Sequence, residues 1–408
     1  MWPRLVANKI LRKRLGSNNF VADFPSNNSE DNIPNLAQSS LSDHQNIDTY
    51  NYKVFVSTWN VGGIVPTEDL DISDWLNTPH ICDIYVLGFQ EIVPLRASNV
   101  LGSENTKTSM IWNSIIRKAL NKKKISQEEP QGFKCIISKQ MVGILISVWV
   151  PTHIRPYIKY PSVSCVGCGI MGCLGNKGAV SVRFRLHQTR FCFVCSHLAS
   201  GGREGDEKHR NSDVAEILSR TSFPRGPSLD LPETILDHER VILFGDLNYR
   251  ISLPEATTRV MVEKEEWDTL LKNDQLILEL MNGQAFEGWH EGLIQFAPTY
   301  KYCPNSNVYF GCVQGKKAEK KRAPAWCDRI IWYGEGLKQH LYSRGEAKFS
   351  DHRPVKAIFS AEVEVVQTLK GFQEFFLSDR FDDQIRSKLK IASSDKLQCH
   401  DGRLSFHL

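Results

Sequence analysis

Short polar clusters beside apolar runs are the feature that most limits how this chain folds. Each run is rich in β-branched residues and has the length of a strand. The clusters are Trp59-Asn60, Gln90-Glu91, Ser196-His197, Gly245-Asp246-Leu247-Asn248 and Ser350-Asp351-His352, which adjoin the runs 53–58, 83–89, 190–195, 241–244 and 353–359. Strands that end in such groups aim them into one crevice at a sheet edge, where catalytic groups sit on a rigid scaffold.

Strands and helices alternate along the chain with no break in composition. Further strands are predicted at 135–138, 141–150, 179–185, 329–333 and 355–365, and the clearest helices at 204–220 and 264–281. The alternation favours one large α/β domain over residues 51–366. Residues 1–50 are predicted to be a disordered leader, because they contain few periodic apolar residues, and residues 367–408 a partly helical tail without evident chemistry.

Composition places the chain among ordinary soluble globular proteins. Hydrophobic residues make up 41% and charged residues 24%, and a formal net charge of +4 is too small to indicate nucleic acid as a partner. No apolar run approaches the roughly 20 residues that span a bilayer, and no secretory apolar segment is present. The 11 cysteines, an odd number, are expected as reduced thiols. We therefore expect a cytoplasmic protein, with the nucleus and peripheral membrane contact left open.

Two apparent motifs are better explained by packing. Residues 167–172 match G-x-G-x-x-G, but the residues that follow predict a strand where a dinucleotide site needs a helix. Cys165, Cys168 and Cys173 have no fourth Cys or His nearby to complete a tetrahedral zinc site. Neither a nucleotide nor zinc is expected here.

Glu91 follows a run too apolar to be exposed, and a buried carboxylate without a partner costs several kcal/mol. A metal ion would supply the opposite charge, with Asn60 contributing a neutral oxygen. Oxygen ligands favour Mg²⁺. For Glu91 taken alone, a structural salt bridge is the alternative.

Residues 245–250, Gly-Asp-Leu-Asn-Tyr-Arg, give the strongest chemical signal. In an extended chain Asp246 and Asn248 point to the same face, and a carboxylate beside an amide activates and orients water. Arg250 adds positive charge for a phosphate. An ordinary Asp-Asn turn after a strand is the alternative.

Three further segments add to this set. Gly175-Asn176-Lys177-Gly178 is a tight turn that offers an amide and a cation to a phosphate oxygen. Asp328 and Arg329 are adjacent, so in a strand they face opposite ways, one toward a catalytic His and one toward substrate. Asp351 places a hard ligand beside His352. A purely structural origin is not expected for so many polar residues at strand edges. These residues are Asn60, Glu91, His197, Asp246, Asn248, Asp328, Asp351 and His352.

Together these segments resemble the inositol polyphosphate 5-phosphatases, a branch of the endonuclease/exonuclease/phosphatase superfamily of metal-dependent phosphoesterases. The resemblance covers residues 52–360, and the opening Met-Trp-Pro-Arg is similar to the plant type I enzymes. It implies two packed β-sheets flanked by helices, a four-layer αββα sandwich. The segments that carry it are 245–250, Pro324-Ala-Trp-Cys-Asp-Arg329, Thr58-Trp-Asn-Val, Gly88-Phe-Gln-Glu-Ile, 175–178, Ser196-His-Leu and Ser350-Asp-His-Arg-Pro.

The resemblance also implies a role for each residue. Glu91 and Asn60, helped by Asp351, would hold Mg²⁺. Asp246 would be the base that activates water and Asn248 would orient that water. The phosphate would be contacted by His197 and by His352, which Asp328 holds in place. The pocket for a neighbouring 4-phosphate would consist of Lys177, Arg250, Tyr300, Lys301, Arg322 and Arg329.

The implied reaction is Mg²⁺-dependent removal of the 5-phosphate from phosphoinositides, such as PtdIns(4,5)P2 and PtdIns(3,4,5)P3, or from soluble Ins(1,4,5)P3 and Ins(1,3,4,5)P4. One alternative is a nuclease or other phosphodiesterase on the same fold, against which residues 324–329 and His197 argue. Another is an inactive phosphoinositide-binding module, against which the presence of Glu91, Asp246 and His352 argues. The sequence ranks neither lipid against soluble substrates nor one oligomeric state against another.

Overall fold

The computed structural model describes residues 18–23, 47–78, 80–102, 106–122, 132–224, 231–283, 285–311 and 322–366. The chain divides into two compact units, residues 1–40 with 49–365, and residues 41–48 with 366–408. The fold and the site below belong to the first unit. The predicted tail at 367–408 and most of the predicted leader lie outside the described residues.

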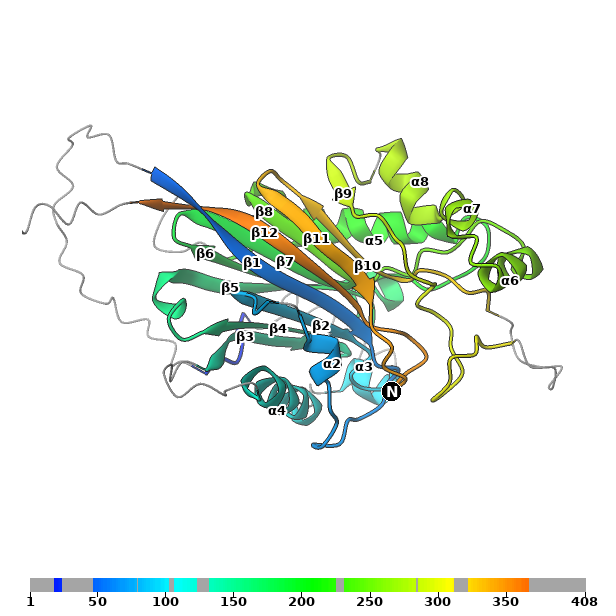
Figure 1. Cartoon of the computed structure of the whole chain (residues 1–408), viewed down its shortest axis with the longest axis horizontal. Coiled ribbons are helices and arrows are strands. Elements are labelled where there is room, and N and C mark those ends of the chain that lie inside the picture. The colour runs from blue at the N-terminus through cyan, green and yellow to red at the C-terminus, as the bar shows by residue number, and fades with distance from the viewer. Residues whose placement is uncertain are drawn as a thin grey trace, which may run out of the picture. The chain divides into compact units, whose positions relative to one another are not determined.

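Two six-stranded sheets form the centre of this unit (Figure 1). In the first sheet the strand order is β11-β12-β1-β2-β4-β3, and in the second it is β5-β6-β7-β8-β10-β9. The first sheet contains β1 (Ile47–Asn60), β2 (Ile84–Gln90), β3 (Phe133–Met141), β4 (Ile144–Pro151), β11 (Leu337–Arg344) and β12 (Val355–Val366). The second contains β5 (Ile158–Gly167), β6 (Gly178–Leu186), β7 (Thr189–His197), β8 (Arg240–Asp246), β9 (Trp289–Glu291) and β10 (Asp328–Tyr333).

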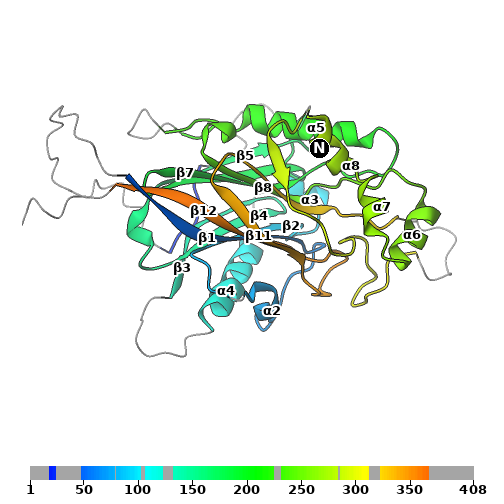
Figure 2. The same cartoon turned by 45° about the horizontal axis from the view of Figure 1, so that its top comes forward.

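Helices cover the outer face of each sheet, as Figure 2 shows with α4 and α2 on one side of the strands and α5 and α8 on the other. The helices are α2 (Ser73–Leu76), α3 (Ala97–Leu101), α4 (Lys107–Asn121), α5 (Asp206–Arg220), α6 (Glu255–Glu263), α7 (Trp267–Leu271) and α8 (Gln275–Asn282). Short 3-10 turns lie at η1 (Arg155–Tyr157), η2 (Ile170–Gly172) and η3 (Ile235–Asp237).

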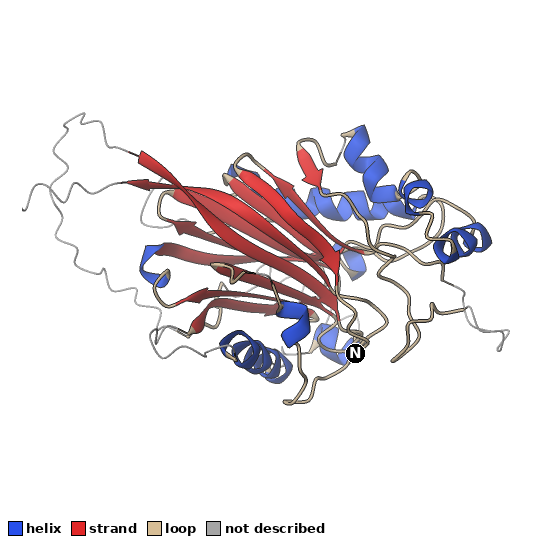
Figure 3. Ribbon diagram, viewed as in Figure 1, coloured by secondary structure: helices blue, strands red, loops and turns tan. Residues whose placement is uncertain are grey.

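The alternation of side chains along each strand explains why the sheets are covered on both faces. In β7, Phe193 and Cys195 belong to the core between the two sheets, whereas Cys192 and Val194 belong to the core under α5 and α8. Fully burying each large apolar side chain contributes about 1.5–3 kcal/mol. The predicted αββα sandwich is confirmed (Figure 3).

Two predicted elements are each split in the structure. Residues 141–150 were predicted as one strand, but the chain turns at Val142, whose φ is 55°, and forms the β3–β4 hairpin. Residues 264–281 were predicted as one helix, but Asp274 ends that pattern because its carboxylate accepts the backbone N–H of Ile277 and begins α8. The helix predicted at 204–220 is present as α5.

Part of the predicted leader is ordered. Val21 and Ser138 exchange backbone hydrogen bonds of 2.9 and 2.7 Å at the edge of β3, and Phe20 packs against the core between the sheets. The strand β1 begins at Ile47. The prediction of disorder was therefore wrong for residues 18–23 and 47–50. The cause is that an unpaired sheet edge offers hydrogen bonds to any chain that passes it, which local composition does not reveal.

Candidate active site

The candidate site lies where strands of both sheets end. β1 and β2 run parallel in one sheet, and β7 and β8 run parallel in the other, so Asn60, Glu91, His197 and Asp246 stand at carboxyl ends. A hydrogen bond of 2.9 Å from Asn60 Nδ2 to Asp246 Oδ2 joins the strand ends of the first sheet to those of the second. The convergence predicted from the polar clusters is thus confirmed.

Gly245 brings β8 close enough to β7 to place Asp246. Its φ is 148°, and a Cβ atom at this position would stand 1.9 Å from the carbonyl oxygen of Ser196. Only glycine fits such an approach. As a result Asp246 stands in register with His197 on one side and with Asp328 on the other.

Asp246 is the centre of a buried polar network. Its Oδ2 lies 2.9 Å from Asn60 Nδ2, 3.2 Å from His197 Nε2 and 4.0 Å from His352 Nε2, and its Oδ1 accepts the backbone N–H of Asn248 at 3.2 Å. Burial alone would raise the pKa of Asp246, but the neighbouring His197, His352 and Lys177 outweigh it and hold that pKa below its usual value. The carboxylate is therefore ionised and able to accept a proton.

Asp328 and His352 form the second part of the network. Asp328 is fully buried, and its Oδ2 lies 2.8 Å from His352 Nδ1 and accepts the hydroxyl of Thr299 at 2.7 Å. Burial lowers the pKa of His352, but the carboxylates of Asp328, Asp246 and Asp351 outweigh it and raise the pKa to about 9. At neutral pH the ring is an imidazolium ion, so both of its nitrogens donate. Asp328 orients this ring, as predicted.

Lys177 approaches His197 from the turn that precedes β6, with 2.5 Å between its Nζ and the imidazole Nε2. Burial lowers the pKa of Lys177 to about 8, against the opposing effect of Asp246 and Glu91. This ammonium group therefore loses its charge near physiological pH more readily than an exposed lysine does.

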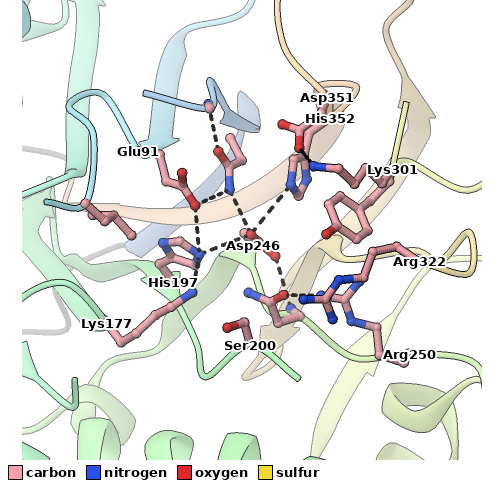
Figure 4. Close-up of a pocket in the computed structure, with 15 residues that line it drawn as sticks. Glu91, Lys177, His197, Ser200, Asp246, Arg250, Lys301, Arg322, Asp351 and His352 are labelled. Atoms are coloured by element: carbon pink, nitrogen blue, oxygen red, sulfur yellow. Dashed lines mark hydrogen bonds and ion pairs between the residues drawn. The ribbon is translucent and has the colours of Figure 1, made fainter. Parts of the chain in front are cut away.

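A cavity of about 320 Å³ opens over this network. Figure 4 shows Asp246 between Glu91, His197 and Lys177 on one side and Lys301, Arg322 and Arg250 on the other. The size suits a small polyanion held between cations on two sides. The lining residues are Asn60, Gly62, Glu91, Leu95, Lys177, His197, Ser200, Asp246, Asn248, Arg250, Tyr300, Lys301, Arg322, Asp351 and His352.

The cations on one side are held by neighbours in the cavity. Arg250 donates from a terminal nitrogen to Asn248 Oδ1 at 2.6 Å, and its guanidinium carbon lies 4.6 Å from the centre of the Tyr300 ring. Lys301 Nζ lies 2.5 Å from Asp351 Oδ2. Asn248 also donates its amide to Leu198 O, so in this structure its side chain holds Arg250 and the loop, and the orienting of water stays a prediction.

Arg329 was predicted to line the substrate pocket, and this is wrong. Its guanidinium is fully buried outside the cavity, 2.8 Å from Asp274 Oδ1 and 2.5 Å from Glu291 Oε2. It faces away from Asp328, as strand alternation requires. Its charge is already matched by two carboxylates, so it belongs to the structural core.

Sequence reasoning also missed cavity residues. Gly62, Leu95 and Ser200 line the cavity, although none lies in a cluster with a chemical signature. Ser200 follows Ser196-His197 by three residues, and that spacing is the only signal that the sequence offers for it.

Glu91 is the cavity residue that best fits a divalent cation. It has a φ of 55°, uncommon for a residue with a side chain and typical of functional sites. Its Oε1 lies 3.4 Å from Asn60 Nδ2 and 3.8 Å from His197 Nε2, and no lysine or arginine among the described residues forms an ion pair with it. The alternative of a structural salt bridge with either is thereby removed.

Other groups that could bind a divalent metal lie near Glu91. Asp246, Asp328 and His352 also form a group with ligand atoms within 4.8 Å of one another. Asp328 is committed to His352 and Thr299, and Asp351 is neutralised by Lys301. Glu91 is therefore the carboxylate best placed to hold a divalent cation. Asn60 lies beside it, but its Oδ1 accepts the backbone N–H of Gly62 at 3.0 Å and its Nδ2 faces Glu91, so its role as a ligand stays a prediction.

Comparison with known proteins agrees with this geometry. Residues 57–358 match Endonuclease/Exonuclease/phosphatase family 2. The chain is 65% identical over 404 residues to the type IV inositol polyphosphate 5-phosphatase 9 of Arabidopsis thaliana, covering 94% of this chain and 97% of the relative. It is 45% identical to the type I inositol polyphosphate 5-phosphatase 8 of the same plant, covering 89% and 86%. The chain belongs to the inositol polyphosphate 5-phosphatase family.

A solved structure of the family supports the same conclusion. The inositol polyphosphate 5-phosphatase domain of SPsynaptojanin, crystallised with inositol (1,4)-bisphosphate and a calcium ion, is 32% identical and superposes with a TM-score of 0.68 over 85% of this chain and 94% of that domain. A Cimex nitrophorin, at 19% identity and a TM-score of 0.57, shares the fold alone. This 5-phosphatase is thus a phosphoric monoester hydrolase with plant relatives of both type I and type IV. Among its described residues, no helix has the length and apolar character needed to cross a membrane.

Proposed function

We propose that this 5-phosphatase uses Mg²⁺ to remove the 5-phosphate from phosphoinositides such as PtdIns(4,5)P2 and PtdIns(3,4,5)P3, or from soluble Ins(1,4,5)P3 and Ins(1,3,4,5)P4. The observation that carries the proposal is the position of Asp246 in a cavity whose two sides present Lys177 and the Lys301, Arg322 and Arg250 set. A base between cations suits water attack on a phosphate ester, which needs charge neutralisation more than covalent catalysis.

Glu91 and Asn60 would hold the metal, which when bound polarises the phosphoryl group and stabilises the leaving inositol oxygen. The chain's own residues do the rest. Asp246 accepts the proton of the attacking water, because its neighbours keep it ionised. Hydrogen bonds from Asn60 to Oδ2 and from the Asn248 backbone to Oδ1 hold its carboxylate in place.

His352 supplies a fixed positive charge to the transferring phosphoryl oxygens. Asp328 holds Nδ1, which leaves the Nε2–H group directed into the cavity near Asp246. His197 stands on the other side of Asp246, beside Lys177. Removing one such preorganised donor costs about 10²–10³ in rate, by analogy with oxyanion-hole donors.

The remaining cations are proposed to select substrates that carry a neighbouring phosphate. Lys301, Arg322 and Arg250 lie with Tyr300 on the side of the cavity opposite Lys177. A substrate with phosphates on two adjacent carbons would meet Asp246 and His352 with one phosphate and this cationic set with the other.

Phosphate release from a panel of soluble and lipid substrates, with Mg²⁺ and after chelation, tests the proposal. We expect release from 5-phosphorylated substrates only, and none after chelation. Activity on a nucleic acid phosphodiester, or full activity in chelator, would contradict it. We propose a cytoplasmic location with peripheral access to membranes, which a comparison of PtdIns(4,5)P2 in vesicles with Ins(1,4,5)P3 in solution and fractionation of the tagged protein would test.

A further inference from the structure

Arg250 enters the cavity from a segment without regular secondary structure, so its position depends on what holds its main chain. Its guanidinium reaches Asn248 and lies over Tyr300, and both contacts require the backbone to stay in place. A cation that is displaced by about 1 Å loses much of its value to a bound phosphate.

Gln275 holds the main chain of Arg250 at two atoms. Its side-chain Oε1 accepts the backbone N–H of Arg250 at 2.9 Å, and its backbone N–H donates to the carbonyl of Arg250 at 2.9 Å. Gln275 is the first residue of α8, directly after the helix cap Asp274. Arg329 holds that cap in the core at 2.8 Å. The support behind Arg250 is therefore rigid.

Arg210 of α5 holds Gln275 in turn. One terminal nitrogen donates to the same Oε1 at 2.7 Å, so that both lone pairs of this amide oxygen are used. The other terminal nitrogen lies 3.4 Å from the carbonyl of Gly201, which follows the cavity residue Ser200. Arg210 therefore ties together two segments that line the cavity.

Burying Arg210 at this position costs stability. Its side chain is fully buried, and among the described residues no carboxylate lies within ion-pairing distance of it. Its Nε has no hydrogen-bond partner in the described structure. A buried cation without an ion pair destabilises a fold. Its guanidinium carbon lies 5.2 Å from the centre of the Tyr249 ring, and its two directed hydrogen bonds reach Gln275 and the segment next to the cavity residue Ser200.

We propose that Gln275, held by Arg210, positions Arg250 for a phosphate of the inositol substrate. Both are positioning residues, since neither lines the cavity. The inference rests on the proposed function, because it assumes that Arg250 meets an inositol phosphate. That contact is made in the ground state and in the transition state alike, so losing it raises KM and leaves kcat nearly unchanged.

The test replaces the amide oxygen at constant volume. In Gln275→Met, KM for Ins(1,4,5)P3 is expected to rise about tenfold while kcat stays within about threefold, consistent with losing one directed hydrogen bond. An unchanged KM would overturn the proposal.

A double-mutant cycle separates positioning from general support. If Gln275 acts through Arg250, the variant that combines Gln275→Met with Arg250→Met is no worse in kcat/KM than Arg250→Met alone. A further loss of kcat/KM in the double variant would show that Gln275 acts elsewhere and would refute the proposal that it positions Arg250.

Arg210→Met and Arg183→Met form a matched pair. Arg183 is also buried, but it donates to the carbonyls of Pro224 and Pro232, outside the cavity. We expect KM to rise about threefold in Arg210→Met and to stay constant in Arg183→Met, with thermal denaturation confirming that both fold. Equal effects on KM would contradict the proposal. Absence of any phosphate release by the unmodified protein would instead refute the proposed function.

Discussion

Two buried charge clusters meet at β10, and they differ in what neutralises their carboxylates. The closed cluster comprises Arg329, Asp274, Glu291 and Tyr342. The open cluster comprises Asp246, Asp328, His197 and His352, three of which line the cavity. Asp328 and Arg329 are adjacent in sequence, so a single strand serves both clusters through its two faces.

In the closed cluster the cation is an arginine, which stays protonated in proteins and binds Glu291 through two parallel contacts of 2.7 and 2.5 Å. In the open cluster the partners are histidines, whose rings give up a proton far more readily than a guanidinium does. A carboxylate paired with arginine has a neighbour that keeps its proton, whereas a carboxylate paired with imidazole has a neighbour that can give up a proton or take one. The choice of cation separates the structural from the reactive cluster better than burial does.

The largest expected effect follows from changing the open cluster. Asp246→Asn keeps the shape of the side chain but removes the base, so kcat is expected to fall by about 10²–10⁴, the range for general-base catalysis. Inositol (1,4)-bisphosphate binding, measured by calorimetry, should be retained, and the denaturation midpoint should fall, because the lowered pKa of Asp246 means that its charge stabilises the fold at neutral pH. Near-normal turnover would remove Asp246 from the role of base.

The closed cluster should respond in the opposite manner. Arg329→Met leaves Asp274 and Glu291 buried without their cation, and we expect the free energy of unfolding to fall by about 3–5 kcal/mol. Urea denaturation measures this loss. Selectivity for substrates with a 4-phosphate over those without it should change far less than stability, because Arg329 does not line the cavity and reaches Arg250 only through Asp274 and Gln275.

A matched variant sharpens the result for the closed cluster. Adding Asp274→Asn and Glu291→Gln to Arg329→Met removes all three charges, and most of the lost stability should return. A selective loss of activity on 4-phosphorylated substrates in Arg329→Met, with stability intact, would instead reinstate the pocket role that the sequence had suggested.

The smallest expected effect is a pH dependence that arises beside the open cluster, at Lys177, which contacts His197. Lys177, with a pKa lowered to about 8, carries its charge below that pH and loses it as the pH rises. We expect kcat/KM to fall several-fold between pH 7 and pH 9, since this ratio reports the free enzyme. Lys177→Arg, which keeps its charge, should give a flatter profile over that range. The same slope in both would assign the dependence to another group.

The site was largely predictable because its residues follow recognisable strands. Asn60, Glu91, His197 and Asp246 come directly at or after β-branched runs, and strand direction alone brings such ends together. The left-handed backbone at Glu91 had no local signal. Ser200 and Leu95 reach the cavity through loops, and loop conformation depends on contacts that local sequence does not encode.

Arg329 shows where sequence reasoning fails. Its partners Asp274 and Glu291 are 55 and 38 residues away, and nothing near Arg329 indicates them. The pairing of Val21 with Ser138 is similar, since a sheet edge rather than local propensity orders that segment. Within the fold, β11 is half-exposed and has a bulge between Gln339 and Leu341. The bulge interrupts the alternation of buried and exposed side chains along this strand.

The placement of β1 beside β12 has a consequence for synthesis. The partners of Asn60 come nearly three hundred positions later in the chain. They are Ser350, whose hydroxyl donates to the Asn60 carbonyl at 2.5 Å, and His352. A nascent chain that has emerged only as far as β10 holds the base but lacks the imidazolium and the strand that flanks β1. We therefore expect hydrolysis only from chains that include this last strand.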